Sequence, residues 1–370
     1  MNIFKYRDDV VRNYEDYVRS FIRIKDRRIS ECVDKAFEDE LLWPDPLIQL
    51  NPTFHPGLTV DELCREDVLH PKCGEIFRRN KVPDSIGGGD PLKLHKHQEV
   101  AIRIAAQKRN YVLTTGTGSG KSLSYIIPIV DRVLRDGPGK GIKAIIVYPM
   151  NALANSQHGE LEKFLRHGFP GGNGPVSFRR YTGQEDDETR QKIIESPPDI
   201  LLTNYVMLEL ILTRPYEQRL INAADALSFL VLDELHTYRG RQGADVALLL
   251  RRVRSIVRSG KLQCVGTSAT LSSKGSWSDQ QVEVARLATR LFGEPVSADD
   301  IVGETLERAT ESFDETSATQ VKALADAVDA QVAGTWTSYQ DLKASPLASW
   351  LEGTFGIRPE AGTEIGRAHV

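Results

Sequence analysis

Thr114-Thr115-Gly116-Thr117-Gly118-Ser119-Gly120-Lys121-Ser122 follows a short apolar run, residues 111–113, and precedes a pattern of helical period over residues 123–134. A strand, a glycine-rich turn and a helix in this order form the setting in which Gly-Lys-Ser binds phosphate, because the turn amides and the helix N-terminus face the anion. Lys121 is expected to reach the β- and γ-phosphates, and Ser122 to place its hydroxyl on Mg²⁺. The predicted phosphate-binding residues are Thr117, Gly118, Ser119, Gly120, Lys121 and Ser122.

This loop departs from the strict phosphate-loop pattern G-x-x-x-x-G-K-[ST] at its first position, where Thr115 replaces glycine. Read alone, the stretch is also compatible with an ordinary glycine-rich turn. The rest of the chain decides between these two interpretations.

The composition is typical of a soluble globular protein, with 40% hydrophobic and 26% charged residues. A length of 370 residues predicts two or three domains. The net charge of −4 argues against a generally basic coat for nucleic acid. It leaves open a groove that contacts a phosphate backbone locally through amides and a few basic side chains.

The cysteines and the apolar runs bear on the compartment. The four cysteines are too few and too scattered for a disulfide framework, which favours a reducing environment. Cys64, His70 and Cys73 lack a CxxC pair and a fourth ligand, so they argue only weakly for zinc. The N-terminus has no apolar core of a signal peptide, and no apolar run approaches the ~18 residues of a membrane span. We predict a cytoplasmic protein with no membrane partner.

Residues 92–270 alternate strand and helix patterns, which is typical of a parallel sheet with helices on both faces. The near-continuous apolar runs at 145–147 and 229–232 indicate strands buried on both sides. The predicted fold class is therefore α/β. We expect strands at 110–115, 142–148, 176–181, 199–204, 227–233 and 262–268, and helices near 98–107, 122–135, 151–166, 205–212 and 242–257.

Weaker patterns flank this region. Residues 1–90 predict a helical N-terminal extension, with a helix over 1–40 and a flexible joint at 85–91. Residues 276–363 predict the helical start of a further, incomplete region. Residues 364–370 resemble the translation of a sequencing-adapter read-through, so we expect a non-native tail and a natural protein that continues. A natural disordered tail is the alternative.

A second site for chemistry follows the apolar strand, at Phe229-Leu230-Val231-Leu232-Asp233-Glu234-Leu235-His236. Asp233, at the tip of the strand, would hold Mg²⁺ through water. Glu234 would polarise the water that attacks the γ-phosphate. Two adjacent carboxylates after a strand also suit the first turn of a helix, but the phosphate loop upstream favours the catalytic interpretation.

Together these two stretches resemble motifs I and II of the superfamily 2 helicases of the DExH type. In that superfamily a small residue other than glycine is common at the position of Thr115, so the departure noted above fits. The resemblance implies that residues 91–275 form a RecA-like P-loop NTPase lobe that binds ATP and Mg²⁺. It assigns Lys121, Asp233 and Glu234 to catalysis.

Shorter stretches resemble further helicase motifs in the expected order, which argues against coincidence even though each alone suits an ordinary turn or surface residue. The resemblance implies that Gln98 reads the adenine edge. It also implies nucleic-acid contacts by Pro149, Asn151, Thr182, Gly183, Thr203 and Asn204, and coupling of nucleotide state to strand movement by His236, Ser268 and Thr270.

Met150–Ala154 and the segment 236–252 are similar to one branch: bacterial DExH helicases related to mitomycin repair factor A, their fungal RecQ-like relatives and phage-defence helicases. This resemblance implies an ATP-dependent DNA helicase and does not separate repair from defence. Helicases of this branch have a second RecA-like lobe, which carries the arginine finger, and we expect no counterpart of that lobe in this chain. Because that finger is worth ~10³–10⁵ in rate, we expect the chain alone to bind ATP–Mg²⁺ weakly and to hydrolyse it poorly.

Three other functions remain open from the sequence. One is a double-strand DNA translocase that does not unwind, and another is an inactive nucleotide-binding fragment. A non-motor P-loop enzyme such as a kinase is the third, although Asp-Glu-Leu-His and Ser-Ala-Thr argue against it. Arg251, Arg252, Arg254 and Arg258 form a basic cluster that suits either nucleic-acid binding or a solvated helix face.

Overall fold

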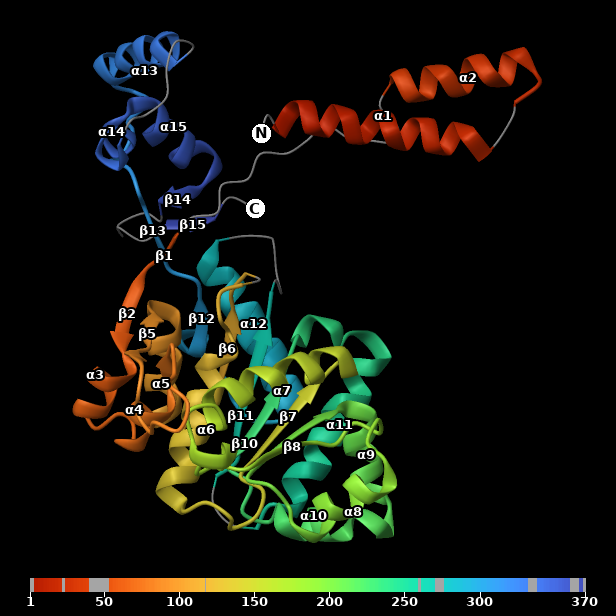
Figure 1. The fold of residues 1–370 in the computed structure, drawn as a ribbon, viewed down its shortest axis with the longest axis vertical. Helices are drawn as coiled ribbons and strands as arrows, with labels where there is room; N and C mark the ends of the chain where they lie inside the picture. Colours follow the sequence, from red (N-terminus) through yellow and green to blue (C-terminus); the bar gives the residue numbers. More distant parts are fainter. Residues whose placement is uncertain are drawn as a thin grey trace.

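A seven-stranded sheet, parallel throughout, forms the centre of the molecule (Figure 1). The computed structural model describes residues 3–21, 24–39, 53–116, 118–258, 261–269, 276–331, 338–359 and 366–368. The strand order is β12-β6-β11-β10-β7-β9-β8. The strands are β6 (Tyr111–Thr114), β7 (Ala144–Tyr148), β8 (Phe178–Arg180), β9 (Ile200–Asn204), β10 (Phe229–Leu232), β11 (Gln263–Ser268) and β12 (Ile301–Gly303). The predicted α/β class is confirmed.

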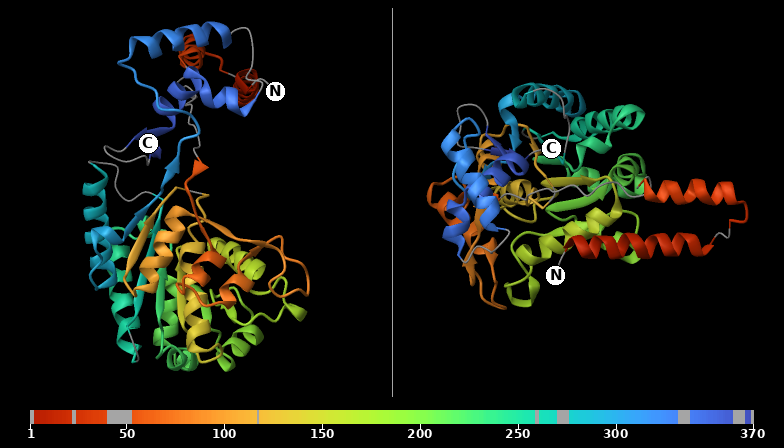
Figure 2. Two further views of the ribbon diagram at one scale, coloured as in Figure 1. Left: turned by 90° about the vertical axis from the view of Figure 1, so that its left-hand side faces the viewer. Right: turned by 90° about the horizontal axis from the view of Figure 1, so that it is seen from above.

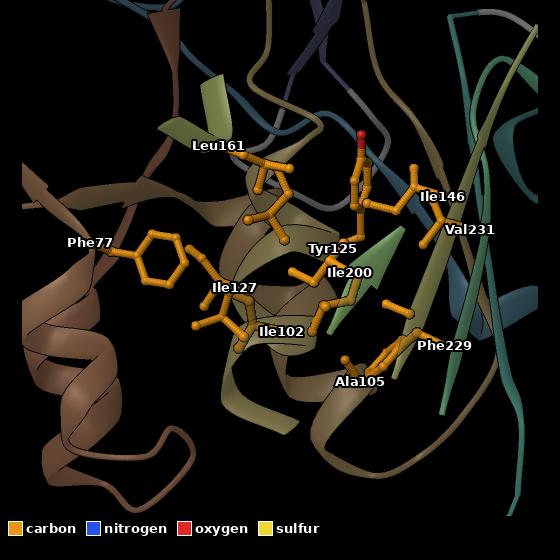
Figure 3. Close-up of a cluster of buried hydrophobic side chains, with 14 of the residues drawn as sticks. Phe77, Ile102, Ala105, Tyr125, Ile127, Ile146, Leu161, Ile200, Phe229 and Val231 are labelled. Atoms are coloured by element: carbon orange, nitrogen blue, oxygen red, sulfur yellow. The ribbon is translucent and has the colours of Figure 1, made fainter. Parts of the chain in front are cut away.

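The central strands are buried on both faces because their side chains alternate between two hydrophobic clusters. Ile146 and Val231 belong to the cluster shown in Figure 3, together with Tyr125 of α6 (Leu123–Asp136). Their neighbours Ile145 and Leu230 belong to the cluster on the opposite face. Every residue of β7 and β10 is buried, as their apolar runs predict.

Helices cover both faces of the sheet and complete the two clusters. On one side lie α5 (Lys96–Ala106), α6 and α7 (Asn151–Leu165). On the other lie α8 (Asp187–Glu195), α9 (Tyr205–Thr213), α10 (Gln218–Ala223), α11 (Gly240–Ile256) and α12 (Trp277–Phe292). Short 3-10 turns occur at Pro170–Gly172, Pro215–Glu217, Leu235–Thr237 and Ala298–Asp300. Among the described helices, none is both long and apolar enough to cross a bilayer.

The N-terminal 90 residues divide into two parts. α1 (Ile3–Phe21) and α2 (Arg27–Glu38) form a hairpin away from the sheet, where Arg19 contacts Asp34 and Phe37 (Figures 1 and 2). The single helix expected over 1–40 is wrong, because the Asp26 side chain accepts the amides of residues 28 and 29 and starts α2 afresh. The segment 43–52 lies outside the described residues.

The second part of this region packs onto the central domain. β2 (Pro56–Thr59) pairs with β5 (Lys93–His95), and β3 (Arg78–Arg79) pairs with β4 (Asp90–Pro91). α3 (Val60–Arg65) and α4 (Lys72–Ile76) contribute Leu63 and Cys73 to the cluster of Figure 3. The packing of the central domain therefore begins before the predicted limit at residue 90.

The sheet also continues past the predicted limit at residue 275, since α12 packs on it and β12 pairs with β6. Beyond β12 the strands β1, β13, β14 and β15 lie together (Figure 1) and form a small second sheet with the order β1-β13-β15-β14. Its strands are β1 (Thr53–Phe54), β13 (Leu306–Glu307), β14 (Ile357–Pro359) and β15 (Gly366–Ala368), and the nearby helices are α13 (Ala318–Gln331), α14 (Tyr339–Ala344) and α15 (Pro346–Phe355). The prediction that residues 364–370 form a non-native tail stays a prediction.

Candidate nucleotide and nucleic-acid site

The predicted phosphate loop connects β6 to α6 at the carboxyl edge of the sheet. Gly118 and Gly120 have φ of +84° and +70°, in the left-handed region that side chains other than hydrogen rarely adopt. A Cβ on Gly120 would also lie 2.6 Å from Gln98 Nε2. Both glycines are thus required by the backbone path of the loop. Thr117 lies outside the described residues.

Buried hydrogen bonds brace this loop from behind. The hydroxyls of Thr115 and Ser119 are 2.7 Å apart, and both residues are fully buried. Thr115 thus contributes a bond that a glycine in its place would lack. His97 Nε2 lies 2.9 Å from the Ser119 carbonyl, which is an acceptor, so this nitrogen carries the proton. Burial lowers the pKa of His97 to about 4.

Gln98 lies behind the loop and is 2% exposed. Its Nε2 donates to the carbonyl of Gly120 at 2.8 Å, and its Oε1 accepts the amide of His95 at 2.8 Å. Both ends of the side-chain amide are therefore used within the chain. The structure shows Gln98 holding the phosphate loop, and its role in reading adenine stays a prediction.

Asp233 and Glu234 follow β10 at the same edge of the sheet. Thr267 on the neighbouring strand donates to Asp233 Oδ1 at 2.5 Å and accepts the Glu234 amide at 3.1 Å. Burial raises the pKa of Asp233, while the Thr267 bond opposes the shift. Glu234 takes a left-handed conformation, with φ of +53°. Thr267 fixes both acids and was not among the predicted site residues.

The two motifs meet at Lys121 and Glu234, whose Nζ and Oε1 atoms are 3.6 Å apart. Glu234 Oε2 lies 3.2 Å from His236 Nδ1, which lies 3.2 Å from Ser268 Oγ. The structure therefore brings Lys121, Glu234 and the two predicted coupling residues His236 and Ser268 into one connected group. Thr270, the last predicted member, lies outside the described residues.

The residues at this edge fit Mg²⁺. Ser122 and Asp233 offer the hard oxygen ligands that this ion prefers, and a nearby cation would stabilise the charged form of the partly buried Asp233. Within the described ranges, no cluster of three or more His, Cys, Asp or Glu side chains could hold a metal. Mg²⁺ would therefore depend on water and on substrate phosphates for its other ligands, as is usual for this ion.

The segments predicted to contact nucleic acid lie at the carboxyl ends of β7, β8 and β9, beside the acids of β10. Asn204 joins them: its Nδ2 donates to Asn151 Oδ1 at 2.7 Å and to the Thr182 carbonyl at 3.1 Å. Its Oδ1 accepts the Met207 amide at 2.7 Å and so caps α9. One side chain thus fixes three of the predicted contact segments.

Glu185 was not among the predicted site residues, and its carboxylate binds the backbone of the predicted contact segment at residues 182–183. Its carboxylate accepts the amides of Thr182 at 2.8 Å and Gly183 at 3.0 Å, and Arg180 Nε donates to it at 2.7 Å. Arg180 also reaches Asn155 of α7. The amides of Thr182 and Gly183, expected to face a phosphate, are therefore hydrogen-bonded within the chain.

Burial separates the predicted contact residues into two groups. Thr203 is 0% exposed and donates its hydroxyl to the Tyr181 carbonyl at 2.7 Å. Gly183 is exposed, and Pro149, Asn151 and Asn204 are partly exposed. Thr203 therefore supports the surface from beneath.

The basic cluster on α11 lies away from these motifs. α11 begins after the carboxyl end of β10 and leads to the amino end of β11, so its last turns lie at the opposite edge of the sheet. Arg254 donates to the Phe292 carbonyl at 2.8 Å, and Arg251 donates to the Arg290 carbonyl at 3.1 Å. Both side chains fasten α11 to the end of α12, which disfavours a shared surface with the predicted nucleic-acid contacts.

A braced phosphate loop facing an Asp-Glu pair at the edge of a parallel sheet defines a P-loop nucleotide-binding domain. Residues 95–276 match the family of DEAD/DEAH box helicases. The chain belongs to this family of ATP-dependent helicases through that segment, as the resemblance of its motifs predicts.

Two curated relatives illustrate the branch. The chain is 26% identical to the Druantia protein DruE of Escherichia coli, over 70% of this chain and 20% of that protein. It is 31% identical to the uncharacterized ATP-dependent helicase YprA of Bacillus subtilis, over 58% of this chain and 28% of that protein. The chain thus spans less than a third of the length of either relative.

Solved structures agree with the fold. A crystal structure of the DUF1998 helicase MrfA bound to DNA has a TM-score of 0.52 and 22% identity, over 73% of this chain and 34% of that one. The DEAD-box helicase Mss116 bound to single-stranded RNA has a TM-score of 0.53 and 18% identity, over 77% and 55% of the two chains. At these identities the likeness shows the RecA-like fold alone.

Proposed function

We propose that this chain is the first motor lobe of an ATP-dependent DNA helicase, in which ATP hydrolysis drives strand movement. The observation that carries the proposal is the approach of Lys121 Nζ to Glu234 Oε1, 3.6 Å apart at the carboxyl edge of the sheet. The hydrogen-bonded group around Asn204 lies at the same edge. Nucleotide chemistry and nucleic-acid contacts can thus act on one another over a short span.

Each group around the nucleotide has a proposed role. Lys121 and the amides of residues 118–122 hold the phosphates, which they reach from the loop and the first turn of α6. Glu234 orients the attacking water, and its second oxygen stays beside His236. Ser122 and Asp233 would hold Mg²⁺, which when bound neutralises charge on the phosphates.

DNA is the proposed track, because residues 150–154 and 236–252 resemble the branch related to mitomycin repair factor A; MrfA, which shares the RecA-like fold, was solved bound to DNA. Asn151, Gly183 and Asn204 offer backbone and side-chain groups that suit phosphates and do not read bases. Binding should therefore tolerate changes of sequence and weaken as salt is raised. A second RecA-like lobe would supply the arginine finger, so we expect the chain alone to bind ATP weakly and to turn it over poorly.

The test is nucleotide binding and DNA-stimulated ATP hydrolysis, measured on this chain and on a longer protein that joins it to a second lobe. Lys121→Ala should abolish both, while Lys140→Ala, an exposed lysine on a distant loop, should change neither. ATP hydrolysis that DNA does not stimulate would contradict a motor function. Triplex displacement without strand displacement would identify a translocase that does not unwind.

A further inference from the structure

Glu304 lies on the short link between the last strand of the large sheet, β12, and β13 of the small sheet. Its Oε2 accepts the amide of Gly116, inside the phosphate loop, at 3.1 Å. A carboxylate from the connection to the small sheet is thus bound to the loop predicted to hold the nucleotide phosphates.

The small sheet reaches the same loop by a second route. β1 pairs with β13, with Phe54 opposite Leu306. The ring of Phe54 lies 5.4 Å from the ring of His97, which bonds the Ser119 carbonyl. The ribbon formed by β1 and β13 is therefore linked to the phosphate loop in two ways: directly through Glu304, which precedes β13, and indirectly through Phe54 and His97.

The charge of Glu304 opposes a bound nucleotide. Gly116 is two residues from Gly118, and two residues span at most about 7.6 Å, so the carboxylate lies on the order of 10 Å from the proposed phosphate position. This distance is close to the Debye length of ~8 Å at physiological ionic strength, so the repulsion is weakened but not lost. The same carboxylate satisfies the amide of Gly116.

We propose that Glu304 is a positioning residue of the nucleotide site. Its carboxylate ties the phosphate loop to the β1–β13 ribbon, and bound phosphates shift this tie toward release. The inference rests on the proposed nucleotide-binding function. It adds that Glu304 transmits the nucleotide state from the phosphate loop to the β1–β13 ribbon. Because such coupling is reciprocal, the tie must weaken nucleotide binding as much as the nucleotide weakens the tie.

The first experiment measures the affinities of the whole chain for AMP, ADP and ATPγS, with Mg²⁺, by calorimetry. Glu304→Gln keeps an acceptor for the Gly116 amide but removes the charge. It should tighten ATPγS about two- to fivefold, ADP less and AMP least, as expected for screened repulsion. Glu307→Gln, an exposed glutamate on the same ribbon, should change none of the three. An equal change for all three ligands, or no change, would overturn the inference.

A second measurement is decided by the natural sequence, so it does not depend on whether Glu304→Gln folds. The amide of His55 donates to the Thr305 carbonyl at 2.8 Å within the ribbon, so hydrogen exchange there reports its release. ATPγS should speed exchange at His55 in the natural sequence and have little effect in Glu304→Gln. Unchanged exchange in the natural sequence would refute the release.

Lys121→Ala separates this inference from the proposed function. If Lys121→Ala leaves ATPγS affinity intact, the nucleotide site itself is misassigned. If that variant loses ATPγS while Glu304→Gln behaves as the natural sequence, the site stands and only the role of Glu304 fails.

Discussion

The carboxyl edge of the sheet has two proposed halves, a nucleotide half with Lys121 and Glu234 and a nucleic-acid half with Asn204 and Glu185, and they differ in how their polar groups are used. In the nucleotide half, Lys121 and Glu234 face each other at 3.6 Å, beyond ordinary hydrogen-bond length. In the other half, Asn204 and Glu185 bind neighbouring groups at 2.7–3.1 Å. The nucleotide half therefore keeps Lys121 and Glu234 available for a ligand. In the nucleic-acid half, the polar side chains connect the loops to one another.

This difference teaches what each half can do alone. A group held at long range from its partner can turn to a substrate at small cost, so single residues of the nucleotide half should control chemistry. Side chains that bond each other act together, so a change in the nucleic-acid half should disturb several loops at once. Glu185 adds a condition: phosphate contact through the amide of Gly183 requires that its bond to the carboxylate be exchanged.

Glu234→Gln tests the nucleotide half and has the largest expected effect. Glutamine cannot take a proton from water, so ATP turnover should fall about 10²–10⁴-fold. Nucleotide affinity should stay near that of the natural sequence, because Lys121 and the loop amides remain. Turnover is measured in a protein that includes a second lobe, and affinity in this chain.

Glu195→Gln, at the exposed end of α8, is the control for this prediction. Equal losses of turnover and nucleotide affinity would mean that Glu234 shapes the site and does not activate water.

His97 gives the next largest effect, through pH. Its pKa in the folded chain is lowered by burial to about 4, against an ordinary value of 6.5. Below pH 6.5 the unfolded chain takes up a proton that the folded chain refuses, so this contribution to stability is complete above pH 6.5 and is lost as pH falls. At ~1.4 kcal/mol per pH unit, the free energy of unfolding should drop by about 2 kcal/mol between pH 6.5 and 5.

Denaturant titrations at several pH values measure this slope. His97→Gln should flatten it, whereas His167→Gln, at an exposed position, should leave it unchanged. A slope that persists in His97→Gln would assign the acid sensitivity to other groups.

Local patterns predicted six strands of the large sheet, because strands depend on neighbours in the sequence, and the same patterns suggested the candidate catalytic residues. The apolar runs of β7 and β10 and the Gly-Lys-Ser and Asp-Glu stretches carry their own signals. α8 went unpredicted because it buries only Ile193 and Ile194, too few for a helical period. β12 is three residues long and pairs with a strand far upstream, so nothing local marks it as the edge of the sheet.

The partners of the site residues could not be predicted for the same reason. Glu304 meets a loop amide 188 positions away, and Thr267 meets Asp233 across 34 positions. Glu185 lies only three residues from Thr182, yet a glutamate in a polar turn has no distinguishing mark in a single sequence. Bonds of this kind follow from the fold and become visible only in it.

Asn204→Ala tests the nucleic-acid half, whose loops are connected by hydrogen bonds. Loss of the α9 cap should lower the free energy of unfolding by about 1 kcal/mol, and loss of the bonds to Asn151 and Thr182 should weaken DNA binding several-fold. Asn204→Ser restores an oxygen for the cap, but its shorter side chain has one hydroxyl donor in place of the NH₂ group that bridges Asn151 and Thr182. It should therefore recover most of the stability and little of the DNA affinity.

Asn222→Ala, on the exposed face of α10, is the matched control for both readouts. If Asn204→Ser recovered stability and DNA affinity together, the bridge would have no role of its own. The comparison between the two halves would then lose its main support.

Arg252→Ala has the smallest expected effect. Arg252, in the C-terminal half of α11, lies 3.9 Å from Glu209 of α9, and its side chain is 47% exposed. A lysine or arginine that neutralises a DNA phosphate contributes about one unit to the slope of log affinity against log salt. We expect that slope, and the affinity for DNA, to be unchanged in Arg252→Ala when measured by fluorescence anisotropy over a salt series. A loss of one unit in this slope would place DNA across the amino edge of the sheet. The division of the carboxyl edge into a nucleotide half and a nucleic-acid half would then no longer describe where the DNA lies.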